Sequence, residues 1–399
     1  MAAQIQPQAL MRAAAERLRE ELALAEARVD LGRLERNIAI VKRKLEGRAK
    51  LLAVVKADAY GHGAVPVAKR AEEAGADMFG VASLAEALEL REAGLERPIL
   101  ILGLPPAHPR HLPLLAELGE LGISLTLDSL ELARALAREA RRRGTRPKVH
   151  LKVDTGLGRI GVRPERALSL MRQLARLRPL QVEGIFSHFS AAASAAEADR
   201  RYTFEQLERF EELLDQLDRA GLLPELRHIA NSAGLIGYLD RVTSGRLNLV
   251  RSGILLYGYP EVEADWTREI KPVLSLHTRV VSVRKVPAGS YLGYGRTYRA
   301  TRPMRVAVLP VGYGDGLDLR LSNRGWVVIR GRRAPIVGRI SMDQTLVDIT
   351  HLGKVEAGDE VELIGDRLPA SELAELLGLG CIEPILTSIS RRVRRVYLN

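Results

Sequence analysis

Short apolar runs and longer amphipathic stretches alternate along the chain from residue 51 onward. Apolar, β-branched runs bounded by turn residues predict strands, whereas apolar positions spaced three or four apart predict helices. The predicted strands are Leu51–Lys56, Met78–Ala82, Pro98–Leu102, Ile123–Leu127, Lys148–Val153, Val182–His188, Arg227–Ala230 and Leu247–Arg251. The helical stretches between them include Val65–Gly75, Leu84–Gly94, Ser129–Arg143 and Asp199–Leu222. This alternation favours a parallel sheet covered by helices.

Eight strands in roughly 200 residues match the count and length of a (β/α)8 TIM-type barrel. A doubly wound sheet is the alternative, but no Gly-rich G-x-G-x-x-G turn follows the first strand. We therefore predict an α/β protein with a (β/α)8 barrel over residues 25–270.

The pattern changes towards the C-terminus, where apolar runs follow one another without long helices. The predicted strands there are Val273–Val286, Met304–Leu309, Trp326–Ile329, Ala334–Val337, Thr345–Ile349 and Glu360–Ile364. We predict a mainly β C-terminal domain over residues 271–399, and expect the strand at 25–31 to pair with it. Residues 1–24 mix charged residues with alanine and leucine, and we expect an N-terminal helical extension there.

Composition narrows the class of protein. The single cysteine, Cys381, excludes an intrachain disulfide, and the longest apolar runs, such as Ile99–Leu104, are far shorter than the roughly 20 residues of a membrane span. The N-terminus has no uninterrupted apolar segment of a secretory signal. The net charge of +11 is spread along the chain, which contains only 4% aromatic residues and no nucleic-acid-binding motif. We expect a cytoplasmic protein that binds neither nucleic acid nor membrane, and no metal site.

Polar residues collect where the predicted barrel strands end. Enzymes with this fold place their reactive residues at the carboxyl ends of the strands. The positions that meet this rule are Lys56, Asp154 to Arg159, His188, Asn231 with Ser232, and Arg251. A lysine at a strand end can be a nucleophile or base, or can simply extend to solvent. The glycines that follow Lys56 favour a site, because they let the backbone approach a ligand closely.

The residues around Lys56, Val55-Lys56-Ala57-Asp58-Ala59-Tyr60-Gly61-His62-Gly63, closely resemble the pyridoxal-phosphate lysine motif of bacterial alanine racemases. The resemblance continues, in order, to the end of the chain. It covers Lys152 to Arg159, Ser187-His188-Phe189, His228 to Ala233, Arg251 to Ile254, Gly293 to Tyr298, Val311 to Gly316 and Gly338 to Gln344. As a set these motifs are highly specific.

The resemblance implies a pyridoxal phosphate (PLP) enzyme that interconverts L-alanine and D-alanine with two bases and supplies D-alanine for peptidoglycan. It also implies a head-to-tail homodimer with shared active sites. Lys56 and Tyr294 would be the bases, and Lys56 would carry the cofactor. The other cofactor-binding residues would be Tyr60, His188, Asn231, Ser232, Arg251, Gly253 and Ile254. Arg159 and Met342 would bind the substrate carboxylate, supported by Asp343 and by Lys152, a position that is often carbamylated in the family.

Two positions depart from the family pattern. Ser341 stands where a cysteine is usual, a small change between two small polar residues. Glu383 stands where we expect a phosphate-binding tyrosine, and a carboxylate repels a phosphate, so we leave Glu383 out of the site.

Other interpretations remain open for the single residues and for the whole chain. His188 and His62 could be structural, Asn231 and Ser232 could cap a helix, and Tyr60 could be a packing residue. The alternative functions are a serine or broad-specificity amino-acid racemase, a PLP-dependent decarboxylase, and a non-catalytic PLP-carrier protein. Arg251 argues against a decarboxylase, since that class places an acidic residue against the pyridine nitrogen.

Overall fold

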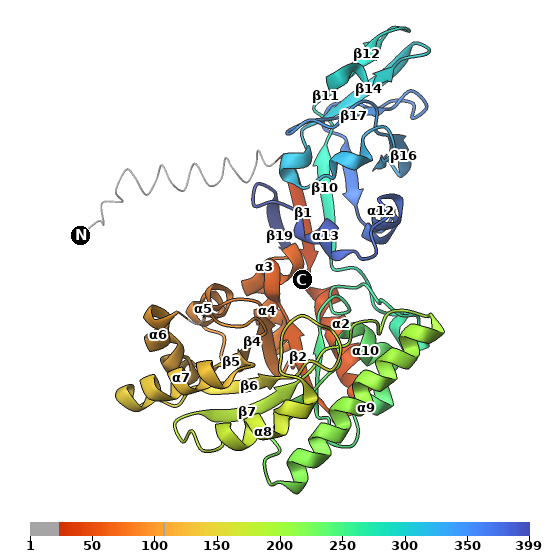
Figure 1. Cartoon of the computed structure of the whole chain (residues 1–399). Helices are drawn as coiled ribbons and strands as arrows, with labels where there is room; N and C mark the ends of the chain where they lie inside the picture. The colour runs from red at the N-terminus through yellow and green to blue at the C-terminus, as the bar shows by residue number, and fades with distance from the viewer. Residues whose placement is uncertain (1–23, 107) are drawn as a thin grey trace, which may run out of the picture. The chain divides into compact units, whose positions relative to one another are not determined.

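The computed structural model describes residues 24–106 and 108–399. They form two compact units, residues 31–271 and residues 24–30 together with 272–399 (Figure 1). The predicted N-terminal helical extension, residues 1–24, lies outside the described residues except for Leu24.

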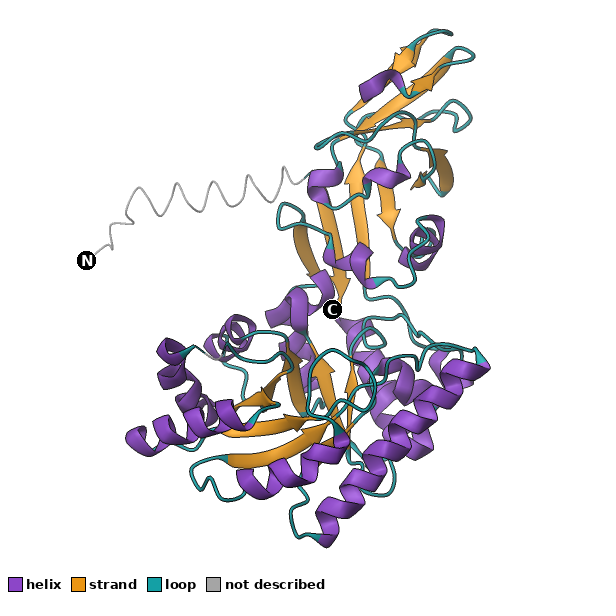
Figure 2. Cartoon of the chain, in the orientation of Figure 1, coloured by secondary structure: helices purple, strands orange, loops and turns teal. Residues whose placement is uncertain are grey.

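The first unit is an eight-stranded parallel sheet that closes on itself, with helices outside it (Figure 2). Its strands are β2 (Lys50–Val54), β3 (Met78–Val81), β4 (Ile99–Ile101), β5 (Ile123–Leu127), β6 (Lys148–Lys152), β7 (Gln181–Phe186), β8 (Leu226–His228) and β9 (Leu249–Ser252). The order is β8-β7-β6-β5-β4-β3-β2-β9. Between β8 and β9, the N–H groups of Asn248 and Arg251 donate to the carbonyls of Arg227 and Ala230. The predicted (β/α)8 barrel is confirmed.

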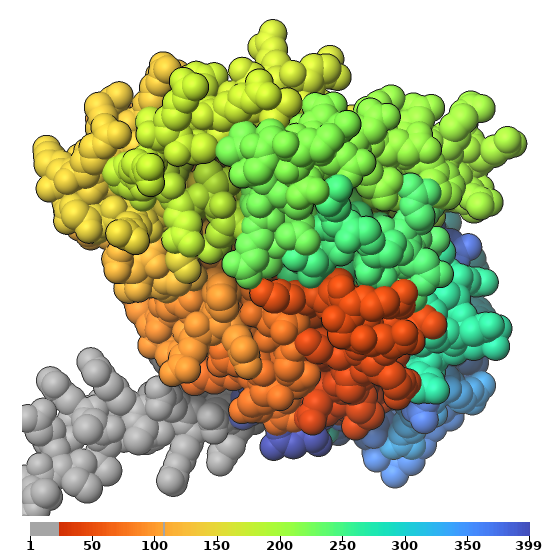
Figure 3. All heavy atoms as spheres, turned by 90° about the horizontal axis from the view of Figure 1, so that it is seen from below, coloured from red at the N-terminus to blue at the C-terminus, as the bar shows by residue number. Residues whose placement is uncertain are grey.

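Helices follow most of the strands and cover the outside of the barrel. They are α2 (Leu31–Leu45), α3 (Lys56–Gly61), α4 (Ala64–Glu73), α5 (Leu84–Glu92), η1 (Pro109–His111), α6 (Leu112–Glu117), η2 (Leu118–Leu121), α7 (Leu130–Arg143), α8 (Pro164–Leu174), α9 (Glu197–Arg219), α10 (Ser232–Gly237), α11 (Leu239–Val242) and η3 (Asp265–Thr267). In Figure 3 the red segment that contains α2 borders the green segments of the last repeats. Arg48 and Lys50 make ion pairs there with Asp240 and Glu225.

Strand register assigns each side chain to one of two faces. Successive strand residues point to opposite faces, and residues paired across parallel strands share a face. Leu52 pairs with Arg251, Leu100 with Ser124, and Thr126 with His150, so these side chains all point into the barrel. The alternate residues, such as Leu51, Phe79, Ile99, Val149 and Leu151, are buried beneath the helices and form the outer core.

The second unit is mainly β, as predicted. Its strands are β1 (Ala25–Asp30), β10 (Leu274–Arg279), β11 (Ser282–Val286), β12 (Tyr291–Leu292), β13 (Tyr298–Arg299), β14 (Met304–Leu309), β15 (Trp326–Ile329), β16 (Arg332–Pro335), β17 (Thr345–Asp348), β18 (Glu360–Ile364) and β19 (Arg394–Leu398). Its helices are η4 (Tyr294–Arg296), η5 (Tyr313–Asp315), η6 (Leu319–Leu321), α12 (Ala370–Leu376) and α13 (Glu383–Thr387). The sheets have the orders β16-β15-β18-β10-β1-β19, β11-β14-β17 and β12-β13.

One predicted strand of this unit, Val273–Val286, is wrong as a single element. It breaks between β10 and β11, where the N–H of Val280 donates to Asp359 and that of Val281 donates to Val308. The chain therefore leaves one sheet and enters another within two residues, which an unbroken apolar run does not reveal. The strand near residue 25 is β1, which pairs antiparallel with β10 and parallel with β19.

Candidate active site

Lys56 follows β2 directly, and the chain after it takes a rare conformation. Residues 57–60 have φ between 51° and 55°, so α3 contains a turn of left-handed helix. This conformation costs an L-residue roughly 1–2 kcal/mol, or roughly 4–8 kcal/mol for four residues. Asp58 Oδ1 accepts from the N–H of Ala64 at 2.8 Å, and Glu86 accepts from the N–H of Ala57 at 2.7 Å. Backbone strain of this size beside a strand-end lysine is typical of functional sites.

Tyr60, at the end of that turn, meets the segment after β9. Its ring lies 4.9 Å from the buried ring of Tyr257, and a Cβ atom on Gly253 would come within 2.5 Å of its hydroxyl. Ser232 Oγ accepts from the N–H groups of Gly253 and Leu255, at 3.0 and 3.4 Å. Hydroxyls and backbone N–H groups therefore gather at this end of the barrel, as an anion requires.

Asn231 and Ile254 flank these residues in the chain. Asn231 Oδ1 accepts from the N–H of Gly234 at 2.9 Å, so Asn231 caps α10, which is the structural role considered above. Ile254 is buried directly after Gly253.

Arg251, on β9, is 3% exposed and is held from several sides. Its Nη2 lies 2.9 Å from His188 Nδ1 and donates to the carbonyls of Ser187 and Ile229, while Nη1 lies 2.6 Å from His228 Nδ1. Nε makes no hydrogen bond to any described residue. Burial, with the charge of Arg159, lowers the pKa of Arg251 to about 9, so the side chain is still a cation at neutral pH.

Lys152 ends β6 with its amine inside the barrel. The side chain is 2% exposed, and Nζ has no hydrogen-bond partner among the residues that the structure describes. Burial and the cations Arg251 and Arg159 lower the pKa of Lys152 well below its ordinary value. A neutral amine, or one converted to an anion, suits this position better than an ammonium group.

The loop after Lys152 is folded around Asp154. Its Oδ1 accepts from the N–H groups of Gly156, Leu157 and Gly158 at 2.9–3.0 Å. Burial raises the pKa of Asp154, but these three bonds outweigh it and lower the pKa below its usual range. The loop delivers Arg159 to the same region.

His188 shows that the predicted barrel residues lie together. Burial lowers its pKa well below the ordinary value, and the charges of Arg251, Lys152, Arg159 and Lys56 lower it further. The site is therefore a cluster of basic side chains around a neutral imidazole, an arrangement that attracts anions.

These residues fit PLP. The lysine that would carry it, the hydroxyls and N–H groups for its phosphate, and an arginine with an unused Nε–H for its ring nitrogen are all present. The basic surroundings suit a cofactor and an amino acid that are both anionic.

Tyr294, Met342 and Asp343 belong to the second unit, where three loops meet. Gly293 packs against the backbone at Arg339, and Gly314 donates to the carbonyl of Met342. Tyr294 is 70% exposed and Met342 51%, which is high for large apolar side chains. Asp343 accepts from Arg392 at 2.7 Å. Glu383, the position that departs from the family pattern, begins α13 in this unit.

Sequence reasoning missed two groups that touch this site, His228 and Phe186, whose rings are stacked at 4.9 Å beside Arg251. The signal for a polar barrel interior was the alternation Lys148, His150, Lys152 along one strand, since polar residues at every second position mark a polar face. It points to His150, the neighbour of His228, and not to His228 or Phe186 themselves. Of the residues that the structure describes, none form a cluster of His, Cys, Asp and Glu placed to hold a metal ion, and no helix is long and apolar enough to cross a membrane.

Comparison with known sequences decides the family. The model for the N-terminal domain of alanine racemase matches residues 29–261, and the model for the C-terminal domain matches residues 273–397. This chain belongs to the alanine racemase family. The alanine racemase of Symbiobacterium thermophilum is 46% identical over 377 residues, 93% of this chain and 96% of that protein. The alanine racemase of Halothermothrix orenii is 42% identical over 94% of this chain and 96% of its own length.

Solved structures of alanine racemases share the fold. The enzyme of Streptomyces lavendulae superimposes with a TM-score of 0.85 at 33% identity, covering 94% of this chain and 97% of its own. That of Clostridium difficile gives 0.86 at 35% identity, covering 94% and 96%. The chain is thus an isomerase of the alanine racemase type, a family that uses PLP and whose general role is to supply D-alanine for the cell wall.

Proposed function

We propose that this chain interconverts L-alanine and D-alanine with Lys56 and Tyr294 as its two bases and with PLP bound through Lys56. The observation that best supports the proposal is the basic cluster around His188, in which Lys56, Arg159 and Arg251 converge. When bound, the cofactor supplies an electron sink that makes the α-proton of an amino acid acidic.

Different residues of the barrel bind different groups of the cofactor. Ser232, Tyr60 and the backbone at Gly253 and Ile254 hold the phosphate, and Asn231 orients the start of α10 beside them. Arg251 would face the ring nitrogen of the cofactor with its Nε–H, which it can only donate. Such a donor would favour an unprotonated ring nitrogen, which disfavours the decarboxylase alternative.

Racemisation needs a proton to leave one face of Cα and another to arrive on the opposite face. Two bases on opposite faces achieve this without either having to cross the plane. The Lys56 amine takes the proton from D-alanine, and the Tyr294 phenolate takes it from L-alanine. A phenol loses its proton more readily beside a cation, and we assign Arg159 as the cation beside Tyr294. Arg159 and the N–H of Met342 bind the carboxylate, and Asp343 holds the Met342 loop through Arg392.

Lys152 supports Arg159 as a carbamate. The lowered pKa of its buried amine provides the neutral nitrogen that forms a bond to the carbon of carbon dioxide; the nitrogen loses one proton to solvent, and the product is an anion between Arg251 and Arg159. Labelled bicarbonate should give a carbonyl signal that disappears in Lys152→Met.

Tyr294 and Met342 reach the site from a second copy of the chain, as a homodimer. Their exposure in the described structure supports this, since large exposed apolar side chains that cluster mark interaction surfaces. A serine or broad-specificity racemase remains the second candidate, because a small pocket rejects one added hydroxyl poorly.

The test of the two bases begins with Lys56→Ala. We expect activity to fall at least about 1,000-fold. Borohydride reduction should label Lys56 in the unaltered protein and should leave position 56 unlabelled in the variant. The control is Lys69→Ala, which replaces an exposed lysine on α4. This variant should keep the racemase activity and the borohydride label on Lys56. A labelled lysine other than Lys56 would refute the assignment.

Mixing inactive Lys56→Ala and Tyr294→Phe subunits tests the shared site. Random pairing should restore about one quarter of wild-type activity, because half of the dimers carry one intact site out of two. No recovery after verified subunit exchange would exclude a shared site.

The alternative substrates are tested with L-serine and L-lysine, which should turn over far more slowly than alanine.

A further inference from the structure

A β-bulge where β6 pairs with β7 sets two residues opposite one. Val149 pairs with Val182 but His150 pairs with Gly184, so Glu183 is the extra residue. Bulges re-aim side chains, and this one turns the Glu183 carboxylate into the barrel. A Cβ atom on Gly184 would overlap the His150 ring, so only glycine leaves room for it.

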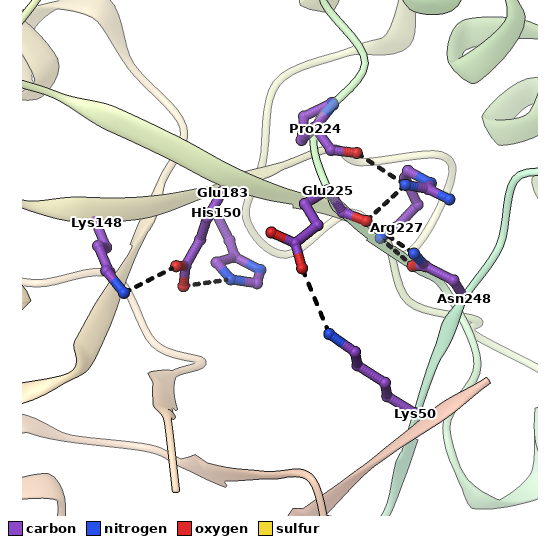
Figure 4. Close-up of polar contacts among 8 residues, drawn as sticks. All are labelled: Lys50, Lys148, His150, Glu183, Pro224, Glu225, Arg227 and Asn248. Atoms are coloured by element: carbon purple, nitrogen blue, oxygen red, sulfur yellow. Dashed lines mark hydrogen bonds and ion pairs between the residues drawn. The ribbon is translucent and has the colours of Figure 1, made fainter. Parts of the chain in front are cut away.

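The bulge begins a line of buried polar contacts. Glu183 Oε1 lies 3.2 Å from His150 Nε2 and also accepts from the Ser124 hydroxyl, while Lys148 Nζ lies 3.6 Å from Oε2. Figure 4 shows Lys148, Glu183 and His150 side by side. On the other edge of the imidazole, His150 Nδ1 lies 3.2 Å from His228 Nε2.

The line ends at Arg251, because His228 Nδ1 lies 2.6 Å from Arg251 Nη1. Phe186 stacks on His228 at 4.9 Å with an interplanar angle of 4°, which fixes the plane of the ring. His150 and His228 are both 0% exposed. Four side chains from four neighbouring strands are therefore joined through the interior of the barrel.

The chemistry of the two ends gives this line a direction. Arginine can only donate, so His228 Nδ1 must be an acceptor and its proton must lie on Nε2. That proton is donated to His150 Nδ1, which leaves the His150 proton on Nε2, facing Glu183. A carboxylate can only accept, so every contact is satisfied with both imidazoles neutral.

We propose that Glu183 is a positioning residue for Arg251, acting through His150 and His228. Its carboxylate holds both imidazoles in the Nε2–H tautomer, so that His228 presents an unprotonated Nδ1 to the guanidinium. The inference rests on the proposed contact between Arg251 and the cofactor ring. If the tautomers reversed, an N–H of His228 would point at an N–H of Arg251, and the arginine would have to move.

The surroundings keep both ends of the line in the required charge state. Burial lowers the pKa of His228 well below its ordinary value, as does the charge of Arg251. It therefore remains neutral at physiological pH.

At the other end, burial raises the pKa of Glu183. Hydrogen bonds from His150 and Ser124 and the charge of Lys148 outweigh it, so the pKa lies below its usual range and the residue is an anion.

Nitrogen NMR of the holoenzyme, labelled only in its eight histidines, reads these tautomers directly. His150 and His228, identified by single His→Gln replacements, should both be Nε2–H, and His228 should not titrate between about pH 6 and about pH 9, where an ordinary histidine has lost its proton by about pH 8. An Nδ1–H tautomer at either position, or a His228 imidazole that titrates, would overturn the proposal.

Glu183→Gln then tests the carboxylate. Lys148 repels the amide NH2 of the variant, which turns towards His150 and donates where an acceptor is needed. The signals of His150 and His228 should shift. Glu225→Gln is the matched control, since Glu225 lies at the same end of the barrel and its carboxylate pairs with Lys50, while only its backbone carbonyl accepts from Arg227 (Figure 4). It should leave both signals unchanged.

Kinetics separate a positioning role from a purely structural one. Glu183→Gln should lower kcat about tenfold with KM for alanine unchanged, and Glu183→Asp should recover part of the loss. An unchanged kcat in a variant whose tautomers have shifted would overturn the positioning role. Failure of the proposed function is distinguishable, because it would appear as unlabelled Lys56 after borohydride while the imidazole signals stayed as expected.

Discussion

The two halves of the barrel interior differ in what fills them. On β2, β3 and β4 the inward positions are apolar, among them Leu52, Met78 and Leu100. On β6 to β9 the inward side chains include the polar or charged residues Lys148, His150, Lys152, Glu183, His228 and Arg251, with the Phe186 ring stacked among them. Both halves share one architecture, so the fold does not dictate the chemistry of its interior.

The difference separates stability from function. Burying an apolar side chain contributes free energy simply by leaving water, whereas a buried ion costs free energy unless it is paired and hydrogen-bonded. Within the described residues, the polar half joins Glu183, His150, His228 and Arg251 through one directed line of contacts, whereas Lys152 Nζ has no hydrogen-bond partner there. We infer that the apolar half mainly stabilises the barrel and that the polar half mainly serves the site.

The largest effect on stability is expected in the apolar half. Leu100→Ala removes a fully buried inward side chain and should lower the free energy of unfolding by about 2–5 kcal/mol. Urea denaturation measures this, and kcat/KM of the folded fraction should be unchanged. A loss of activity in protein shown to be folded would contradict the division between the halves.

The opposite result is expected for Arg251→Met. Loss of the inward guanidinium that contacts His228 and His188 should lower kcat/KM by about 100- to 1,000-fold, or about 2.7–4 kcal/mol. Stability should change little, because the gain from replacing a buried cation with an apolar side chain is offset by the carbonyls and imidazoles that lose their donor. Activity within experimental error of the unaltered protein would show that Arg251 is structural.

The apolar half was the predictable one. Apolar runs such as Leu51 to Val55 predict buried strands without any knowledge of the neighbouring strands, and all eight barrel strands were predicted. The helices α2 and α8 were not among the predicted helices, although α2 buries Leu34, Ile38, Val41 and Leu45 at helical spacing.

Two features of the site could not be predicted from local sequence. The left-handed turn at 57–60 opposes the preferences of alanine, aspartate and tyrosine, so it is imposed by the surrounding fold. The bulge at Glu183 exists only in the pairing of two strands. Lys56, Arg159 and Arg251 were predicted from the resemblance of their motifs. The line of contacts from Glu183 to Arg251 can be recognised only from the register in which the barrel strands pair.

A smaller effect with a defined pH dependence is expected for Lys152→Met in bicarbonate-free buffer. Because the pKa of Lys152 is lowered in the fold, the folded state binds fewer protons than the unfolded state between that pKa and about 10.4, so stability of the unaltered protein rises with pH there. Methionine removes the cost of the buried charge and should add about 1–4 kcal/mol at the acid end. This advantage should shrink as pH rises. An advantage that grew with pH would contradict a lowered pKa.

The smallest effect compares two glycines, one from each half. On Gly80 a Cβ atom would meet Leu52 Cδ2 at 2.5 Å and Leu102 Cδ1 at 3.2 Å, the ends of flexible side chains that can rotate away. On Gly184 it would meet the His150 ring, which is held at both nitrogens and cannot move without breaking the line to Arg251.

Gly184→Ala should therefore cost about 1–3 kcal/mol and Gly80→Ala less than about 1 kcal/mol. The lower entropy of the unfolded chain favours alanine at both positions alike, so it cancels in the comparison. Only Gly184→Ala should also lower kcat, since it displaces His150. Adding His150→Ala to Gly184→Ala should restore part of the lost stability, because the second change opens the space that the first one fills. Equal costs at the two glycines, or strict additivity in the double variant, would mean that the imidazole is free to move and that the two halves respond alike.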